Sequence, residues 1–154
     1  MIKIKTLKDS VEINVSPELV WDWLSRFAEN YCDWHPAHVK AYWEKGEPNE
    51  IDSVLYTEEE LGGRTLKMSI RVSKMIPNRL IEFKTIKALR IFLPRGAFEI
   101  EPSEKGCIVS AILVFRMGKL LSKIAKKIFK AVSEHMAEEG ENLKKILESQ
   151  FFIN

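Results

Sequence analysis

One long amphipathic pattern at the end of the chain constrains the fold more than any other feature. Between Leu120 and Leu147, apolar residues recur at helical spacing, so that they share one face. These residues are Leu121, Ile124, Ile128, Val132, Met136, Leu143, Ile146 and Leu147. We therefore predict a helix over residues 120–149 whose apolar stripe faces a core.

The chain before this helix alternates between apolar and polar residues, with turn residues between the alternating runs. Alternation predicts strands, here over residues 3–15, 39–43, 53–61, 64–74, 80–85, 89–102 and 107–117. Gly62 and Gly63 predict a tight hairpin. Ser16 as N-cap and Pro17 at the first helical position predict a helical segment that ends before Pro36.

These elements predict an α+β fold. Strands joined in hairpin succession form an antiparallel sheet, and we expect a curved sheet of about six or seven strands around the long C-terminal helix. A sheet that wraps one helix can leave a cavity between the two. The expected elements fill all 154 residues, so we predict a single domain spanning 1–154.

Composition narrows the classes of function. The formal net charge is +2, which gives no argument for a nucleic-acid partner. No apolar run approaches the roughly 20 residues that span a bilayer, and the N-terminus lacks the apolar run of a signal peptide. The cysteines, Cys32 and Cys107, stand far apart without CxxC spacing, which favours a reducing compartment. We therefore expect a cytoplasmic protein.

Two polar residues interrupt the apolar face of the predicted final helix. His135 and Glu139 are four positions apart, so their side chains lie one above the other and can hold a common ion. A carboxylate in a core requires a partner. The simpler alternative is that the two residues bond each other or a nearby arginine, such as Arg71 or Arg90.

Other candidate ligands come from two earlier segments. The remaining histidines are His35 and His38, and either one offers a third ligand. In the predicted strand 53–61, the more apolar face carries Glu59, which we expect to point inward. Glu58 replaces it if the register shifts by one residue, and a solvated edge for all the glutamates remains the alternative.

The order of elements resembles the START and polyketide-cyclase superfamily, which has the helix-grip fold. The resemblance covers essentially the whole chain. It rests on the strand-to-helix entry at residues 15–21 and on the turn into a central strand at residues 76–83.

A narrower resemblance, to metal-dependent diacetylphloroglucinol hydrolases, rests on residues 34–38 and 135–143. His135 and Glu139 match the His-x-x-x-Glu motif of that family, and His38 matches a histidine that follows Trp-x-Pro. The resemblance implies a zinc ion held by two histidines and two glutamates, and cleavage of a carbon–carbon bond in an acylated phenol. Here one residue, Ala37, separates the proline from the histidine where the family has two.

We therefore predict a metal site made of His38, Glu59, His135 and Glu139. Two imidazoles with two carboxylates suit zinc, and also manganese or ferrous iron. The predicted activity is that of a hydrolase or lyase acting on a small apolar or phenolic carbonyl compound. His35 is the candidate base that carries a proton, and it is also the alternative ligand to His38.

Two other functions stay open. One is a metal-free carrier of a small hydrophobic molecule, and the other is a cyclase-like enzyme that uses His and Glu for acid–base chemistry without metal. Tyr31 and Trp34 are candidates to stack on an aromatic ligand, or to pack as cavity wall. The lysines of residues 119–130 make one side of the final helix basic, which is typical of a solvated face or of a membrane-surface contact.

Overall fold

The computed structural model describes residues 2–119 and 122–151. In chain order, the elements are β1 Lys3–Ile13, α1 Pro17–Ser25, α2 Phe27–Trp34, β2 His38–Lys45, β3 Val54–Leu61, β4 Arg64–Ile76, β5 Leu80–Ile86, the 3-10 helix η1 Ala88–Ile91, β6 Arg95–Pro102, β7 Cys107–Met117 and α3 Ser122–Phe151. The predicted helix start at Leu120 and the predicted apolar position Leu121 lie outside the described residues.

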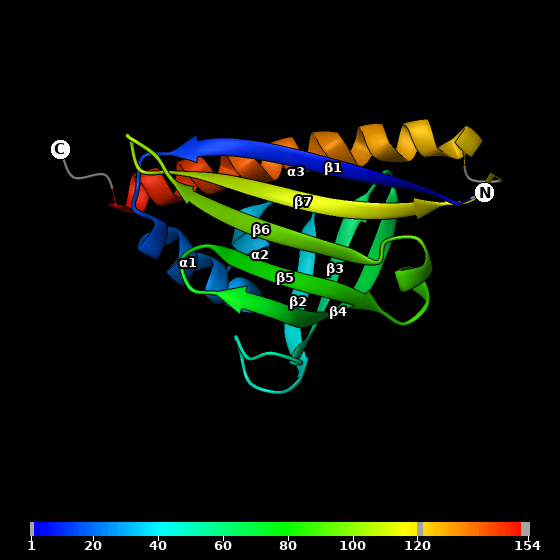
Figure 1. The fold of residues 1–154 in the computed structure, drawn as a ribbon, viewed down its shortest axis with the longest axis horizontal. Coiled ribbons are helices and arrows are strands. Elements are labelled where there is room, and N and C mark those ends of the chain that lie inside the picture. The colour runs from blue at the N-terminus through cyan, green and yellow to red at the C-terminus, as the bar shows by residue number, and fades with distance from the viewer. Residues whose placement is uncertain (1, 120–121, 152–154) are drawn as a thin grey trace.

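The strands form one antiparallel, curved sheet, in the order β1-β7-β6-β5-β4-β3-β2. Long helix α3 runs lengthwise along the sheet beside β1 (Figure 1). The α+β helix-grip fold predicted from the sequence is therefore confirmed. Its first and last strands along the chain lie together, because β1 pairs with β7.

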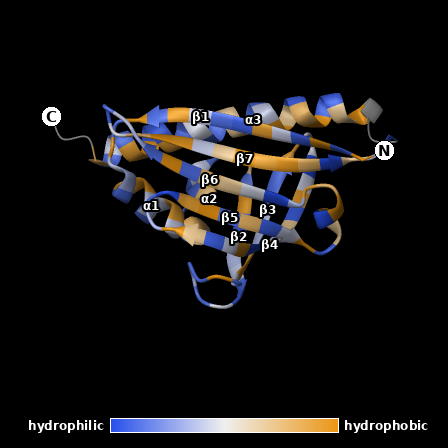
Figure 2. Ribbon diagram, in the orientation of Figure 1, coloured by the Kyte–Doolittle hydropathy of each residue, from blue (hydrophilic) through white to orange (hydrophobic). Residues whose placement is uncertain are grey.

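Local sequence signals explain where several elements begin and turn. The Ser16 hydroxyl accepts a hydrogen bond from the Leu19 N–H and so caps α1, with proline at the start of the helix. Gly62 and Gly63 both have positive φ, the backbone that a two-residue hairpin between β3 and β4 requires. Alternating side chains point to opposite faces, and hydropathy alternates along strands such as β4, whereas β7 is hydrophobic over most of its length (Figure 2).

The predicted strand 89–102 is wrong in its first part. The chain forms η1 there and enters β6 only at Arg95. Lys87 takes a positive φ of 66°, which turns the chain out of β5. Pro94 lacks a backbone N–H, so it cannot donate to the ladder of the sheet.

The buried face of α3 differs from the predicted stripe near its beginning. Ile124 is exposed, whereas Ala125 and Phe129 are buried. Phe129 packs edge-to-face on Phe115 of β7, so the first turns of the helix are oriented by that contact. Farther along, the stripe is as predicted, with four buried residues: Val132, Met136, Leu143 and Leu147. No helix among the described residues is long and apolar enough to cross a membrane.

Candidate metal and ligand site

A cavity of about 290 Å³ lies between the inner face of the sheet and α3. Most of its wall is apolar, with side chains that include Leu61, Phe83, Leu89, Phe92, Phe98, Ile128 and Val132. Glu59, His135 and Glu139 line the same cavity. The cavity is therefore a hydrophobic chamber with a concentrated polar wall.

His38, the first residue of β2, adjoins this polar wall through its contacts with His135 and Glu139. Its Nδ1 lies 2.8 Å from the Tyr31 carbonyl oxygen. A carbonyl only accepts, so Nδ1 carries a proton, and in the neutral ring Nε2 is the nitrogen with the lone pair. The Tyr31 ring stacks on the imidazole at 3.9 Å, and the His38 side chain is fully buried. The ring is thus fixed in the tautomer and orientation typical of a metal-binding histidine.

Helix α3 supplies two donors from one face. The Nε2 of His135 lies 3.4 Å from the Glu139 carboxylate, one turn along the helix. The other Glu139 oxygen is 3.1 Å from the Nε2 of His38. Among the described residues no arginine pairs with Glu139. The other half of the simpler alternative, a direct contact between His135 and Glu139, is present.

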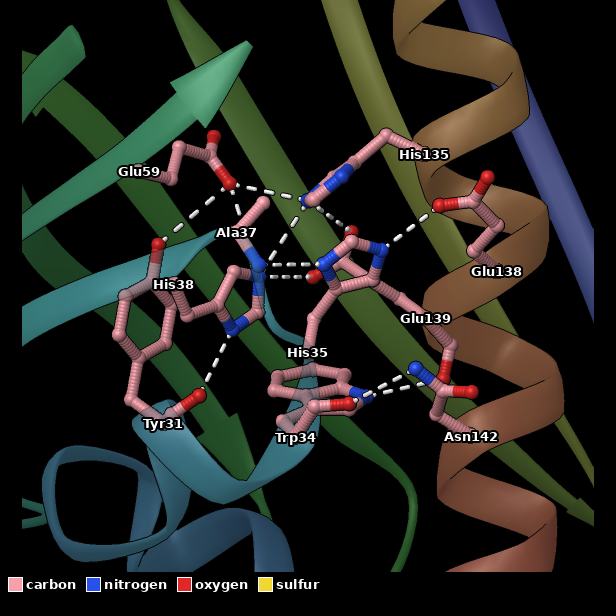
Figure 3. Close-up of polar contacts among 10 residues, drawn as sticks. All are labelled: Tyr31, Trp34, His35, Ala37, His38, Glu59, His135, Glu138, Glu139 and Asn142. Carbon is pink, nitrogen blue, oxygen red and sulfur yellow. Dashed lines mark hydrogen bonds and ion pairs between the residues drawn. The ribbon is translucent and has the colours of Figure 1, made fainter.

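Strand β3 supplies the fourth donor. The Glu59 carboxylate lies 3.0 Å from the Nε2 of His135 and 3.6 Å from that of His38. Glu58 points to the other face of the sheet, where it lies 3.7 Å from the Lys67 ammonium. The register of β3 therefore places Glu59, and not Glu58, beside the histidines (Figure 3).

His38, His135 and Glu139 each place a ligand atom close enough to share a single small cation, and Glu59 adjoins the two histidine nitrogens. Two donors of a tetrahedral ion with bonds of about 2.0–2.2 Å stand roughly 3.3–3.6 Å apart. The two Nε2 atoms of His38 and His135 are 3.3 Å apart, and the carboxylate contacts to them span 3.0 to 3.6 Å. The donor set and its spacing therefore fit zinc, manganese or ferrous iron. Metal binding itself stays a prediction.

His35 is oriented differently from His38. Its Nδ1 accepts a hydrogen bond from the Ala37 N–H at 2.9 Å, so its proton resides on Nε2. That Nε2 lies 2.7 Å from the exposed Glu138 carboxylate. Both ring nitrogens are therefore engaged, which favours His38 over His35 as a ligand. The His35 ring lies 4.4 Å from that of His135, so the predicted role of His35 in carrying a proton stays open.

Tyr31 and Trp34, the predicted ligand-binding residues, both line the cavity. The Tyr31 hydroxyl donates to the Glu59 carboxylate at 3.5 Å. Burial, followed by the charges of Glu59 and Glu139, raises the pKa of Tyr31, so the phenol stays protonated. The Trp34 ring packs edge-to-face against His38 at 5.7 Å, so part of its surface is wall and not free for stacking.

Sequence reasoning assigned no role to Asn142, which ties the site together. Its side-chain amide donates to the Trp34 carbonyl at 3.1 Å. The Trp34 indole N–H in turn donates to the Glu139 carbonyl at 2.9 Å. These two bonds fasten the end of α2 to α3. The sequence held one signal for this role, which is spacing: Asn142 lies almost one helical turn beyond Glu139 and so near the same side of α3.

The carboxylates of the cluster act on the pKa of His135. Burial lowers the pKa of His135, but its hydrogen bond to Glu59 and the charge of Glu139 outweigh burial, so the pKa is raised. The surroundings of His135 therefore favour positive charge. A proton or a metal cation satisfies that demand, and the two compete for the same nitrogen.

The comparisons with known proteins identify the class. The family described as "Polyketide cyclase / dehydrase and lipid transport" matches residues 5–148. The chain belongs to this family. No curated protein matches the chain.

Solved structures with the same fold include two enzymes. One is norcoclaurine synthase from Thalictrum flavum in complex with dopamine and hydroxybenzaldehyde, with TM-score 0.75 and 13% identity over 96% of this chain and 88% of that chain. The other is the Zhui aromatase/cyclase from Streptomyces sp. R1128, with TM-score 0.75 and 15% identity over 96% of both chains. A third is the Polyketide_cyc-like protein Cgl2372 from Corynebacterium glutamicum, with TM-score 0.58 and 19% identity over 96% of this chain and 94% of that chain.

At these identities the likeness shows the fold alone. None of these three structures is a diacetylphloroglucinol hydrolase, so that resemblance rests only on the motif residues. The family and the helix-grip fold are confirmed, whereas zinc and hydrolase activity stay predictions.

Proposed function

We propose that the protein is a metal-dependent hydrolase or lyase that acts on a small apolar or phenolic carbonyl compound inside the cavity. One observation carries this proposal. Two imidazole nitrogens and two carboxylates converge at one side of a largely apolar chamber, and Glu59, His135 and Glu139 line the chamber there. Clusters of this kind, in a cavity of this kind, are the usual form of a reactive centre.

The proposed ligands are His38, Glu59, His135 and Glu139. A zinc ion, or manganese or iron in its place, would supply Lewis acidity and lower the pKa of a bound water to about 7. The chain fixes the donors beforehand, because the Tyr31 carbonyl locks His38 and the Trp34 indole holds the backbone at Glu139. Such fixed donors need little reorganisation when the site is used.

Other side chains would bind and orient the substrate. The apolar wall excludes water and accepts an apolar or aromatic body. The Tyr31 phenol, kept protonated and donating to Glu59, can accept a hydrogen bond from a substrate hydroxyl. His35 contacts His135 and bonds the exposed Glu138, so it is placed to pass a proton toward the surface.

A carrier of a small hydrophobic molecule is the second candidate function. The observation that favours it is the lining, which is apolar over most of the cavity. In that case the histidines and glutamates would serve as a polar anchor for one end of the ligand. A carrier would bind such a molecule without converting it.

The first experiment measures metal content in protein purified without a histidine tag. We expect about one zinc, manganese or iron per chain, given one cluster of four donors. Metal-loaded protein is then assayed for turnover of acylated phenols and related small ketones and esters. Glu139→Gln should abolish turnover, whereas Glu134→Gln, the same change at an exposed position of α3, should retain most of it.

The outcomes separate the candidates. Stoichiometric metal without turnover of any compound, together with tight binding of an apolar ligand, would favour the carrier. Turnover that survives complete removal of metal would favour an acid–base enzyme that needs none. Absence of metal from the purified protein, with no uptake on addition, would contradict the proposed site.

A further inference from the structure

One end of the molecule is built from three segments that contain no acidic residue. They are residues 2–8 at the start of β1, residues 83–98 around η1, and residues 113–119 with 122–133 at the end of β7 and the start of α3. The whole chain has 24 basic residues against 22 acidic ones. Positive charge is therefore concentrated here and balanced by acidic residues elsewhere.

Contacts between these segments show that they meet at one end. Ile4 of β1 pairs with Arg116 of β7, and the Arg116 backbone N–H donates to the Phe92 carbonyl, just after η1, at 2.8 Å. The Lys5 ammonium lies 4.9 Å from the centre of the Phe129 ring on α3. The start of β1, the end of β7 and the start of α3 lie at the same end of the molecule (Figure 1).

Four large aliphatic side chains are exposed at this end. Their exposed fractions are 66% for Ile2, 71% for Ile4, 69% for Ile91 and 57% for Ile124. The same segments carry seven exposed cations: Lys3, Lys5, Arg90, Arg116, Lys126, Lys127 and Lys130. Within residues 2–119 and 122–151, none of these cations forms an ion pair. We call these four isoleucines and seven cations the basic end.

We propose that the basic end docks on the surface of an anionic phospholipid bilayer. Cations beside exposed aliphatic side chains are the combination that binds such an interface, because the charges meet lipid headgroups while the apolar groups enter the acyl boundary. A single-stranded nucleic acid would favour aromatic side chains for base stacking. The large exposed side chains of the basic end are isoleucines.

The cavity gives the docking a consequence. Leu89 and Phe92 flank the exposed Ile91 in sequence, and both line the cavity. The same short segment therefore faces the chamber on one side and the proposed membrane on the other. Docking would bring the apolar end of the chamber close to the lipid, where apolar small molecules concentrate.

The test is flotation of the whole protein with vesicles. Vesicles of phosphatidylglycerol and phosphatidylcholine should carry the protein at low ionic strength, and those of phosphatidylcholine alone should not. The triple variant Lys126→Glu, Lys127→Glu, Lys130→Glu should bind at least tenfold more weakly. The matched control Lys40→Glu, Lys105→Glu, Lys145→Glu makes the same change of charge outside the basic end and should retain most of the binding.

A second variant tests the aliphatic contribution. Ile4→Ser with Ile91→Ser and Ile124→Ser keeps every charge and should also weaken vesicle binding at least tenfold, with an unchanged melting temperature as the check on folding. No binding to anionic vesicles would overturn the proposal. The proposal would also be overturned if the isoleucine changes left vesicle binding unaltered and a single-stranded oligonucleotide bound with equal affinity. That result would favour general binding of polyanions.

Discussion

The Nε2 atoms of His38 and His135 lie 3.3 Å apart in a buried site. Because the proton of the His38 ring is held at Nδ1 by the Tyr31 carbonyl, its Nε2 presents a lone pair. The two glutamates beside these nitrogens also present lone pairs. A proton on His135 or a metal cation between these acceptors would relieve the repulsion among their lone pairs. The raised pKa of His135 has the same cause, because Glu59 and Glu139 favour a positive charge there.

The first prediction is stabilisation by metal. Zinc or manganese added to chelator-treated protein should stabilise the native state by about 2.7 kcal/mol at a hundredfold excess over Kd. For a domain of this size that raises the melting temperature by roughly 5–10 °C. His38→Ala should abolish the rise, and His35→Ala should keep it. A rise that depends on His35 instead would show that the other histidine is the ligand.

The second prediction separates the two neighbouring glutamates of β3. Glu59→Gln should weaken metal binding at least tenfold. Changing a residue that only hydrogen-bonds to a metal ligand typically weakens metal affinity roughly 10–100-fold, and a change to a ligand itself should cost no less. Glu58→Gln removes the same charge from the opposite face and should leave metal affinity nearly unchanged. Titration calorimetry of both variants tests this. Equal effects would mean that charge near the site, and not ligation, determines affinity.

The third prediction concerns pH and the end of α3. A hydrogen bond from the Lys144 ammonium, followed by one from the Asn14 N–H, lowers the pKa of Glu148. A carboxylate with a lowered folded-state pKa stabilises the protein above its unfolded pKa, and this contribution disappears as pH falls through the folded-state value. Glu148→Gln should therefore lower the free energy of unfolding by about 1 kcal/mol at pH 7. Denaturation with urea should show this difference shrinking and then vanishing as pH falls below the ordinary carboxylate pKa and through the lowered folded-state value.

The fourth prediction concerns the two thiols. Cys32 is exposed and should react readily with a thiol reagent in the native protein. Cys107 has no exposed surface, and burial raises its pKa to about 11, so at pH 8 it remains a protonated, inaccessible thiol. Native protein should therefore show one reactive thiol and denatured protein two. A second native thiol would indicate that β7 opens away from β1.

Much of the fold and site follows from periodicity. Alternation along β3 places Glu59 inward with Thr57, and the helical repeat brings His135 and Glu139 onto the cavity side. The choice between His35 and His38 could not be made from spacing. It depends on the Tyr31 carbonyl and the Ala37 N–H, two backbone groups whose positions only the folded chain defines.

Other details depend on contacts distant in sequence. The exposure of Ile124 follows from the packing of Phe129 on Phe115, which fixes the rotation of the first turns of α3. The 3-10 helix before β6 follows from the turn at Lys87 and the proline at position 94. Neither the exposure of Ile124 nor the 3-10 helix produces a periodic pattern that can be recognised in a short stretch of sequence.

The separation of the ligands along the chain has a consequence for biosynthesis. His38 and His135 are 97 residues apart, and Glu59 stands between them on a central part of the chain. A nascent chain still lacking α3 presents only part of the donor set. High-affinity metal binding would therefore become possible only after the C-terminal helix has left the ribosome and packed on the sheet. Metal occupancy would then indicate that α3 has been made and has packed on the sheet.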